Sequence, residues 1–146
     1  MTITIEQLQL DELKVFLHKQ ADDAFPDLKD ELRLNMLAKK WHEYAEFCTC
    51  RDDANKLVGI IAFYANNPET GVAFIPHVYV NRELRGKDIF SLMLQEITSH
   101  IRPIGFNEIK LEVANDNIRA QKAYLKQGFE KCGESNRKSI YMIKNT

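Results

Sequence analysis

Apolar residues recur every three or four positions in three parts of the chain, which is the spacing of one face of an α-helix. The clearest stripe consists of Ile89, Met93, Ile97 and Ile101. This spacing predicts a helix that starts near Leu10 and is broken by residues 24–27, a second over about 29–44 and a third over 88–101. The cap residues at positions 115–117 predict a fourth helix over 118–127.

Between these helices, apolar and β-branched residues form short runs that end at turn signals, the pattern of β-strands. The predicted strands cover residues 2–6, 46–51, 56–65, 72–80, 108–113, 129–134 and 139–144. Pro76 cannot donate a ladder hydrogen bond, so we expect a bulge or a splayed edge in the strand that contains it. Because the chain shows no repeat, low-complexity segment or linker, we expect residues 1–146 to form a single domain.

The charge balance and the hydropathy exclude several classes of protein. The chain has 20 basic and 21 acidic residues and a formal net charge of −1, whereas a nucleic-acid-binding domain is usually basic. No apolar run reaches the roughly 20 residues that a membrane-spanning helix needs, and the N-terminal residues lack the pattern of a signal peptide. We therefore expect a cytoplasmic protein that binds neither nucleic acid nor a membrane.

The three cysteines are too few and odd in number for a disulfide framework, and they suit a reducing compartment. Cys48 and Cys50 flank Thr49, so both side chains lie on one face of a predicted strand. No further Cys or His lies at the spacing of zinc ligands. The sequence therefore predicts free, buried thiols at Cys48 and Cys50 and no metal site.

The segment from Arg85 to Phe90 combines a basic, glycine-containing turn with the start of a helix. The first amides of a helix have no partner within it, and the helix dipole favours an anion beside them. Gly86 lets the backbone approach a phosphate, and Arg85 and Lys87 add positive charge. These features predict an anion-binding turn.

This turn and two later segments resemble, in order and spacing, the acetyl-CoA-binding core of the GNAT acetyltransferase superfamily. The later segments are the strand LEVANDN, which carries one carboxylate, and the helix AQKAYLKQGF. Asn117, Ala120 and Tyr124 match the family pattern NxxAxxxY. The resemblance implies an α/β (α+β, mixed-sheet) GNAT-like fold, with a central, splayed β-sheet flanked by about four helices. It covers residues 72–129 clearly and residues 1–71 only in the order of their elements.

The resemblance also implies which residues bind the pyrophosphate of acetyl-CoA. The family's turn is Arg or Gln, two variable residues, Gly, one variable residue, and Gly or Ala, and its backbone amides hold the pyrophosphate. The corresponding residues here are Arg85, Gly86, Lys87, Asp88, Ile89 and Phe90. Asp88 and Phe90 thus replace the two small residues. Asp88 either places a carboxylate near the pyrophosphate or caps the helix and points away from the ligand.

In the family, the strand before this turn splays from its neighbour and pairs with the pantetheine arm, and one of its amides polarises the thioester carbonyl. By position, these contacts fall to Val78, Tyr79 and Val80. The resemblance further implies that Asn117 and Ala120 belong to the cofactor site. The hydroxyl of Tyr124 would lie near the sulfur, where it can protonate the departing thiolate.

Glu112 is the candidate for the catalytic base, because family members often deprotonate the amine through a strand carboxylate, directly or through water. It lies in an otherwise apolar strand, where burial would raise its pKa toward useful values. The alternative is a solvent-facing or salt-bridged glutamate. His77 and His42 could also act as bases near neutral pH, although a lone histidine is more often structural.

The first two predicted helices would form the acceptor side of such an enzyme. The second carries Leu34, Leu37, Trp41 and Tyr44 on one stripe. The cluster from Trp41 to Tyr44 could line an acceptor pocket or belong to the core. The junction of these helices is acidic, which would suit a cationic amine; the alternative is that these are solvated loop and cap charges. The acidic residues are Asp22, Asp23, Asp27, Asp30 and Glu31.

Three functions remain open on the sequence alone. The resemblance implies an acetyl-CoA-dependent N-acetyltransferase that transfers an acetyl group to a primary amine of a small molecule or peptide by direct attack on the thioester. The replacements at Asp88 and Phe90 favour a non-catalytic, GNAT-like coenzyme-binding or regulatory module instead. A third possibility is a protein-interaction domain that keeps only the fold. The C-terminal strands could form the edge of a homodimer.

Overall fold

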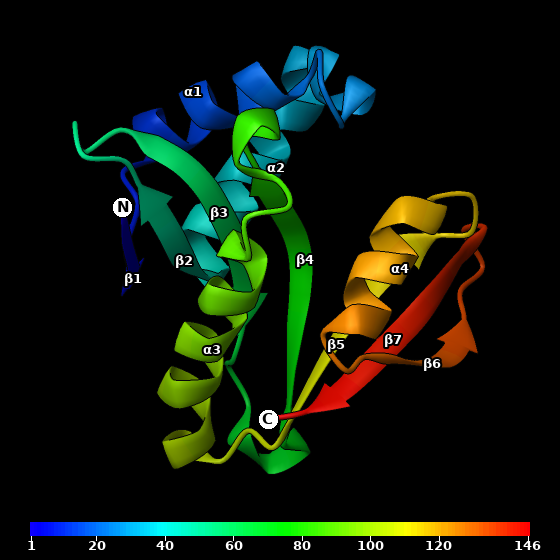
Figure 1. The fold of residues 1–146 in the computed structure, drawn as a ribbon. Coiled ribbons are helices and arrows are strands. Elements are labelled where there is room, and N and C mark those ends of the chain that lie inside the picture. Colours follow the sequence, from blue (N-terminus) through cyan, green and yellow to red (C-terminus); the bar gives the residue numbers. More distant parts are fainter. The chain divides into compact units, whose positions relative to one another are not determined.

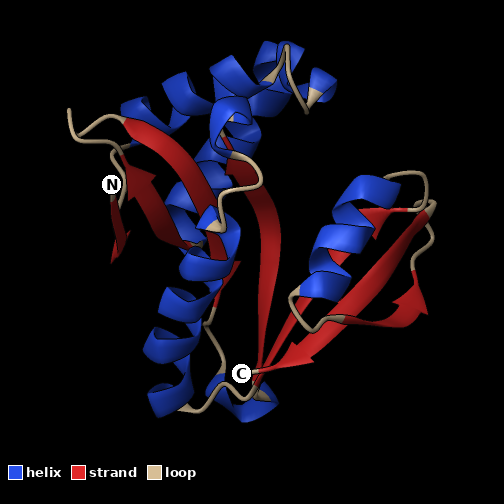
Figure 2. Cartoon of the chain, in the orientation of Figure 1, coloured by secondary structure: helices blue, strands red, loops and turns tan.

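The computed structural model describes residues 1–146, which form two compact units. Unit 1 comprises Met1–Phe63 and His77–Ile97, and unit 2 comprises Tyr64–Pro76 and Thr98–Thr146. Figure 1 traces the elements along the chain, and Figure 2 separates helices from strands by colour.

All the predicted helices and strands are present, and their boundaries differ from the prediction by a few residues. The helices are α1 (Leu10–Gln20), α2 (Glu31–Tyr44), α3 (Ile89–Ile101) and α4 (Ile118–Lys126). The strands are β1 (Thr2–Glu6), β2 (Glu46–Arg51), β3 (Leu57–Tyr64), β4 (Val72–Val80), β5 (Glu108–Ala114), β6 (Glu130–Glu134) and β7 (Ser139–Asn145).

The strands follow the hydrogen-bonded order β1-β2-β3-β4-β5-β7-β6. β4 pairs with β5 in parallel, whereas β1 with β2, β2 with β3, β5 with β7, and β6 with β7 are antiparallel. The sheet is therefore mixed, and with its four helices it confirms the predicted fold class.

The strand that contains Pro76 is disrupted at the predicted place. β4 pairs with β5 only from Val72 to Ile75, and the pairing stops one residue before the proline. Proline has no amide hydrogen and cannot continue the ladder as a donor. The chain nevertheless stays extended to Val80, and Asn81 N then donates to Val58 O at 2.9 Å within unit 1. The predicted disruption thus takes the form of an end to the pairing with β5.

In unit 1, helices cover both faces of the first strands. Cys48 Sγ lies 3.6 Å from Met93 O of α3, so α3 covers the face of β2 that carries the two buried cysteines. Both thiols are free and fully buried, as predicted, and burial raises the pKa of Cys48 to about 12. The stripe of α3 is also confirmed, because Ile89, Met93, Ile97 and Ile101 are all buried, each worth about 1.5–3 kcal/mol of transfer free energy.

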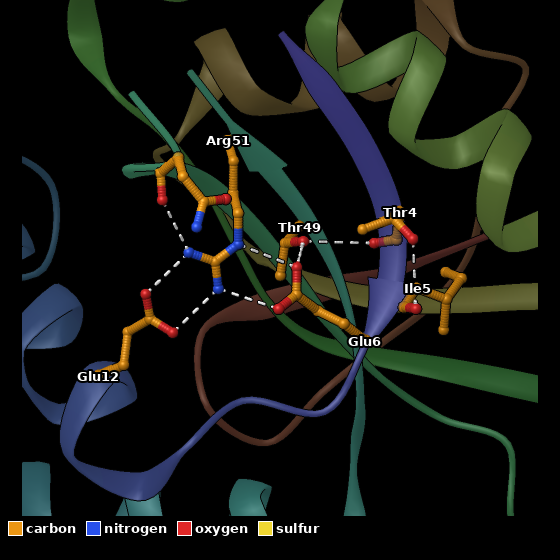
Figure 3. Close-up of polar contacts among 7 residues, drawn as sticks. Thr4, Ile5, Glu6, Glu12, Thr49 and Arg51 are labelled. Carbon is orange, nitrogen blue, oxygen red and sulfur yellow. Dashed lines mark hydrogen bonds and ion pairs between the residues drawn. The ribbon is translucent and has the colours of Figure 1, made fainter. Parts of the chain in front are cut away.

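On the opposite face of unit 1, Arg51 fastens α1 to the sheet (Figure 3). Its Nε and Nη2 donate to the carboxylate of Glu6 at 3.1 and 2.9 Å. Its Nη1 and Nη2 donate to the carboxylate of Glu12 in α1, both at 2.9 Å. The Thr49 hydroxyl also donates to Glu6. The hydrogen bond from Arg51 holds the pKa of the Glu6 carboxyl below its usual range.

The predicted stripe of α2 is correct at its start and wrong at its end. Leu34, Ala38 and Trp41 are buried, whereas Tyr44 is 56% exposed. Tyr44 is the last residue of the helix, and Ala45 already has extended backbone. A period of 3.6 residues brings Ala38 into the core and turns Tyr44 away from it.

In unit 2, α4 covers one face of β5 and β7 (Figure 1). Lys144 pairs with Ile109, and its Nζ donates to Gln127 O at the end of α4 at 2.7 Å. The buried side chains of β5, including Leu111, lie on this face. Because side chains alternate along a strand, Glu112 faces away from α4.

Candidate active site

The turn between β4 and α3 has backbone conformations that favour glycine. Gly86 has φ +81° and Asp88 has φ +62°, both in the left-handed region that L-residues rarely adopt. Aspartate is one of the few other residues that enter this region at moderate cost, because its short polar side chain can interact locally. Asp88 therefore keeps the conformation that a glycine would adopt there without strain.

The turn has free space and an unpaired cation beside it. An added Cβ on Gly86 would meet no atom within 4 Å. Lys87 is exposed and makes no hydrogen bond or ion pair. Leu92 N donates to Asp88 O at 3.1 Å, which begins α3 and leaves the first helical amides at the turn. A pyrophosphate fits this combination of amides, space and charge.

Asp88 does not cap α3 with its side chain. Its carboxylate is exposed and accepts no hydrogen bond, neither from the helix amides nor from any other group. The interpretation of Asp88 as a side-chain cap is therefore wrong. The reason is the left-handed backbone, since a capping side chain normally belongs to a residue with extended backbone. The carboxylate remains a negative charge at the helix start.

Arg85 is engaged within unit 1 and supports the turn from inside. Its Nε donates to Val80 O at 3.0 Å, and its guanidinium lies 5.3 Å from the centre of the Tyr79 ring. Its Nη2 donates to the carboxylate of Asp23. The exposed cation next to the turn is thus Lys87, while Arg85 joins the end of β4 to the turn after α1.

Asp23 accepts hydrogen bonds from three side chains. Besides Arg85, the donors are the Tyr79 hydroxyl at 2.6 Å and Arg82 Nη2 at 2.7 Å. Only 15% of the Asp23 side chain is exposed. The bond from Tyr79, together with those from Arg82 and Arg85, holds the pKa of the Asp23 carboxyl well below its usual range. Burial and this bond raise the pKa of Tyr79 to about 12.

The other acidic residues at the junction of α1 and α2 also have partners. Asp30 caps α2 by accepting from the amides of Leu32 and Arg33 at 3.0 and 3.3 Å. The remaining pairs are Asp22 with Lys29 at 3.6 Å, Asp27 with Arg33 at 2.8 Å, and Glu31 with His18 at 3.7 Å. These contacts support the interpretation of the junction as loop and cap charges, and they leave no unpaired carboxylate there for a cationic amine.

His77 is a core residue of unit 1. Its Nε2 is 2.7 Å from Gln20 Oε1, and its ring lies 4.5 Å from the ring of Phe25 and 4.8 Å from that of Trp41, between centroids. Burial lowers the pKa of His77 to about 4. The imidazole is therefore neutral near pH 7, and its position in the aromatic core favours the structural interpretation.

The cluster from Trp41 to Tyr44 does not act as one group. Trp41 is buried against His77, whereas His42, Glu43 and Tyr44 are exposed.

In the strand predicted to contact the pantetheine arm, Tyr79 and Val80 have buried side chains and Val78 is half-buried. Tyr79 and Val80 thus offer only their backbone to a cofactor arm, whereas Val78 also offers a half-buried side chain.

Glu112 in unit 2 is half-buried and paired with a hydroxyl. Its Oε2 accepts from Ser139 Oγ, which is itself hydrogen-bonded to Ser135 Oγ. Ser135 Oγ accepts from Arg137 N at 3.1 Å. Glu112 is therefore neither salt-bridged nor fully solvent-facing, but a carboxylate held in place by a serine on the neighbouring strand.

The residues of the predicted NxxAxxxY pattern lie on α4. Asn117 Oδ1 accepts from Ala120 N at 3.1 Å and so caps the helix, which leaves the Asn117 amide nitrogen for other contacts. The ring of Tyr124 meets the ring of Phe129 edge-on, 5.8 Å between centroids. Burial raises the pKa of Tyr124 to about 12, so its phenol stays protonated and can donate at neutral pH.

Comparison with known proteins identifies the family. Residues 8–129 match the sequence model of the acetyltransferase (GNAT) family. The chain belongs to this family. Members of this family are acetyltransferases, and their co-substrate is acetyl-CoA, as the resemblance implied. No curated protein sequence matches the chain significantly.

Solved structures of GNAT acetyltransferases share the fold over the whole chain. The PaiA N-acetyltransferase of Thermoplasma acidophilum, solved in complex with coenzyme A, matches with a TM-score of 0.79 and 18% identity and covers 100% of both chains. Ard1 of Thermoplasma volcanium matches with a TM-score of 0.74 and 19% identity, covering 100% of this chain and 99% of its own. A GNAT acetyltransferase of Staphylococcus aureus Mu50 matches with a TM-score of 0.72 and 17% identity, covering 99% of each chain.

The candidate residues of this GNAT member divide between the two units. The turn before α3 and the end of β4 lie in unit 1, and Glu112, Asn117 and Tyr124 lie in unit 2. No helix of the structure has both the length and the apolar character to cross a membrane. The sequence placed Asp23 only among the acidic residues of the helix junction, and its contacts with Tyr79, Arg82 and Arg85 were missed. Its partners lie 56–62 positions away along the chain, so no local pattern points to them.

Proposed function

We propose that this GNAT member is an acetyl-CoA-dependent N-acetyltransferase that transfers the acetyl group to a primary amine of a small molecule or peptide. The observation that carries the proposal is the exposed turn before α3. It keeps left-handed backbone at Gly86 and at Asp88, with Lys87 unpaired beside it. Such a turn presents backbone amides to an anion, which is what a pyrophosphate needs.

The coenzyme would be held mainly by backbone groups of unit 1. The amides of the turn from Gly86 to Phe90, including those of Asp88 and Ile89, would bind the pyrophosphate, and the charge of Lys87 would favour it. The end of β4, from Val78 to Val80, would offer backbone groups to the pantetheine arm. Arg85 fixes the turn rather than reaching for the ligand, because Val80 and Asp23 already engage its guanidinium. In unit 2, Asn117 would contribute its amide nitrogen next to Ala120.

When bound, acetyl-CoA supplies an activated thioester carbonyl that an amine can attack directly. Glu112 would accept the proton of the amine, directly or through water, and Ser139 would keep its carboxylate oriented. A backbone amide between Val78 and Val80 would polarise the carbonyl. Tyr124 would protonate the departing thiolate, a role that its protonated phenol supports.

The family and the name of one similar protein support an amine as the class of acceptor. PaiA is named an N-acetyltransferase, which supports an amine as the acceptor here.

Three further properties remain predictions: a single domain over residues 1–146, a cytoplasmic location, and a homodimer that pairs through the edge strand β6. Gel filtration with light scattering would test the dimer.

The test is thiol release from acetyl-CoA in the presence of a panel of amines. The panel holds a polyamine, an amino sugar, free amino acids and a lysine-containing peptide, and mass spectrometry checks each product for an added acetyl group. Tyr124→Phe should lower kcat by about 100-fold, the lower range of general acid catalysis, and leave the KM for acetyl-CoA unchanged. Tyr44→Phe, at an exposed tyrosine, is the matched control. An unchanged kcat in Tyr124→Phe would remove this residue from the mechanism.

One observation favours the second candidate, a coenzyme-binding module without turnover. The Asp88 carboxylate stands unpaired at the helix start, where it opposes the phosphate charge. A protein that binds coenzyme A but releases no thiol with any amine of the panel would be such a module. Acetylated product with a single amine would exclude it.

A further inference from the structure

We propose that Asp23 is a positioning residue for the coenzyme turn: it fixes Arg85 and Arg82, and through them the backbone that presents its amides to the pyrophosphate. The inference rests on the proposed function, because the turn must first bind coenzyme A. It adds a residue from the turn after α1 to a site otherwise built from β4 and the start of α3.

Asp23 is joined to both ends of the segment that leads into the turn. Tyr79 lies in β4 just before this segment, and its hydroxyl donates to Asp23 Oδ2 at 2.6 Å. Arg82 lies at the start of the segment and donates to Asp23 Oδ1 at 2.7 Å. Arg85 lies directly before Gly86 and donates to Asp23 Oδ2. One carboxylate thus holds residues 79, 82 and 85 against the end of α1.

The geometry is that of a structural anchor. Arg85 binds Asp23 and Val80 O at the same time, so its side chain clamps the turn to the last residue of β4. The Tyr79 ring lies beneath the Arg85 guanidinium at 5.3 Å, and its other neighbours are the rings of Phe16 and Phe25. Hydrogen bonds between charged groups are the stronger ones. The side chains of Asp23 and Arg85 are only 15% and 27% exposed, whereas that of Arg82 is 75% exposed, so the bond to Arg85 carries most of the anchoring.

Positioning and simple electrostatics predict opposite effects when the charge of Asp23 is removed. A negative charge near an anion site weakens binding of the anion, so on electrostatic grounds alone Asp23→Asn should bind coenzyme A more tightly. If Asp23 positions the turn, the same substitution should weaken binding, because an asparagine amide cannot accept from Tyr79 and both arginines. The sign of the change therefore separates the two explanations.

The experiment is a calorimetric titration of the whole protein with coenzyme A, and in parallel an NMR titration with pantetheine, which lacks the phosphates. Asp23→Asn should raise the Kd for coenzyme A about tenfold, the weight of one hydrogen bond to a charged group, and leave the Kd for pantetheine unchanged. Asp22→Asn is the matched control, because its carboxylate is 91% exposed and reaches only Lys29 at 3.6 Å. It should change the Kd by less than about twofold at physiological salt.

A second variant keeps the proposal testable if Asp23→Asn does not fold, as judged by circular dichroism. Tyr79→Phe removes one donor to Asp23 without changing any charge, and it should raise the Kd for coenzyme A severalfold. Equal or tighter binding of coenzyme A by Asp23→Asn, equal losses for coenzyme A and pantetheine, or an unchanged Kd in a Tyr79→Phe protein would each overturn the inference. If the natural protein binds no coenzyme A, the inference falls together with the proposed function. If the natural protein binds coenzyme A but the variants do not show the stated changes in Kd, the inference about Asp23 alone is wrong.

Discussion

Asp88 offers a direct test of how the turn binds its anion, because charge and backbone can be changed separately there. Asp88→Asn removes the charge and keeps a residue that tolerates the left-handed region. Asp88→Gly removes the charge and also the strain at φ +62°. Asp88→Ala removes the charge but leaves a residue for which this backbone is costly.

The expected gain in affinity follows from Coulomb's law. Two unit charges 4 Å apart repel by about 1 kcal/mol in water and by about 4 kcal/mol at an effective dielectric constant of 20. Because the Asp88 carboxylate is exposed, a value near the lower limit applies, about 1–2 kcal/mol. All three variants should therefore bind coenzyme A about five- to thirtyfold more tightly than the natural protein.

The expected changes in stability differ among the three variants. Asp88→Ala should lose about 1 kcal/mol, the usual cost of left-handed backbone for a residue with a Cβ. Asp88→Gly should change the free energy of unfolding by less than about 1 kcal/mol, because the relief of strain is offset by the greater freedom of glycine in the unfolded chain. Asp88→Asn should leave it almost unchanged.

Calorimetric titration with coenzyme A at two salt concentrations, together with urea unfolding, measures both quantities. The gain in affinity should shrink at high salt, because exposed charges are screened. Unchanged affinity in Asp88→Asn and Asp88→Gly would refute the reasoning, since it would mean that the carboxylate lies far from the bound phosphates. Weaker binding in both would show that the carboxylate takes part in binding.

Two further predictions concern stability. The pKa of His77 is about 4 in the folded protein, against an ordinary value of 6.5. As the pH falls between these two values, the unfolded state binds a proton at this residue and the folded state does not. The free energy of unfolding should therefore fall by about 2 kcal/mol from pH 7 to pH 5. Urea unfolding at both pH values should show a smaller drop in His77→Gln, and an equal drop would rule out His77 as its source. Arg51→Met leaves Glu6 and Glu12 without their cation and should cost about 2–3 kcal/mol. Arg33→Met, which breaks the exposed pair with Asp27, should cost less than about 1 kcal/mol, and similar losses in both would contradict the importance of the Arg51 cluster.

The sequence predicted those parts of the fold that depend on local pattern. The stripe on α3 was correct because four large apolar residues at helical spacing leave one choice of buried face. Pro76 predicted a bulge or a splayed edge because proline lacks the donor that the ladder needs, and the pairing of β4 with β5 ends one residue before it. Tyr44 was misplaced because the period of 3.6 residues turns the position three residues after Trp41 away from the core.

The candidate site was less accessible from the sequence. An aspartate at the start of a predicted helix suggested that Asp88 caps α3. Its φ of +62°, which goes with the absence of a cap, is a property of the folded turn. Arg85 matched the family pattern, whereas its partner Asp23 could not be predicted, because the contact joins segments 62 residues apart. The burial of His77 between aromatic rings likewise depends on how Phe25, in the turn after α1, and Trp41, in α2, pack against β4.

The most direct test of the central claim is a calorimetric titration of the unaltered protein with acetyl-CoA. The account predicts one-site binding with a Kd in the micromolar range, because the turn before α3 keeps its free amides, its open space and the charge of Lys87 despite the Asp88 carboxylate. Absence of binding at millimolar acetyl-CoA, with affinity appearing in Asp88→Gly, would mean that this carboxylate closes the turn to phosphate. The assignment of an acetyl-CoA-dependent N-acetyltransferase would then be wrong.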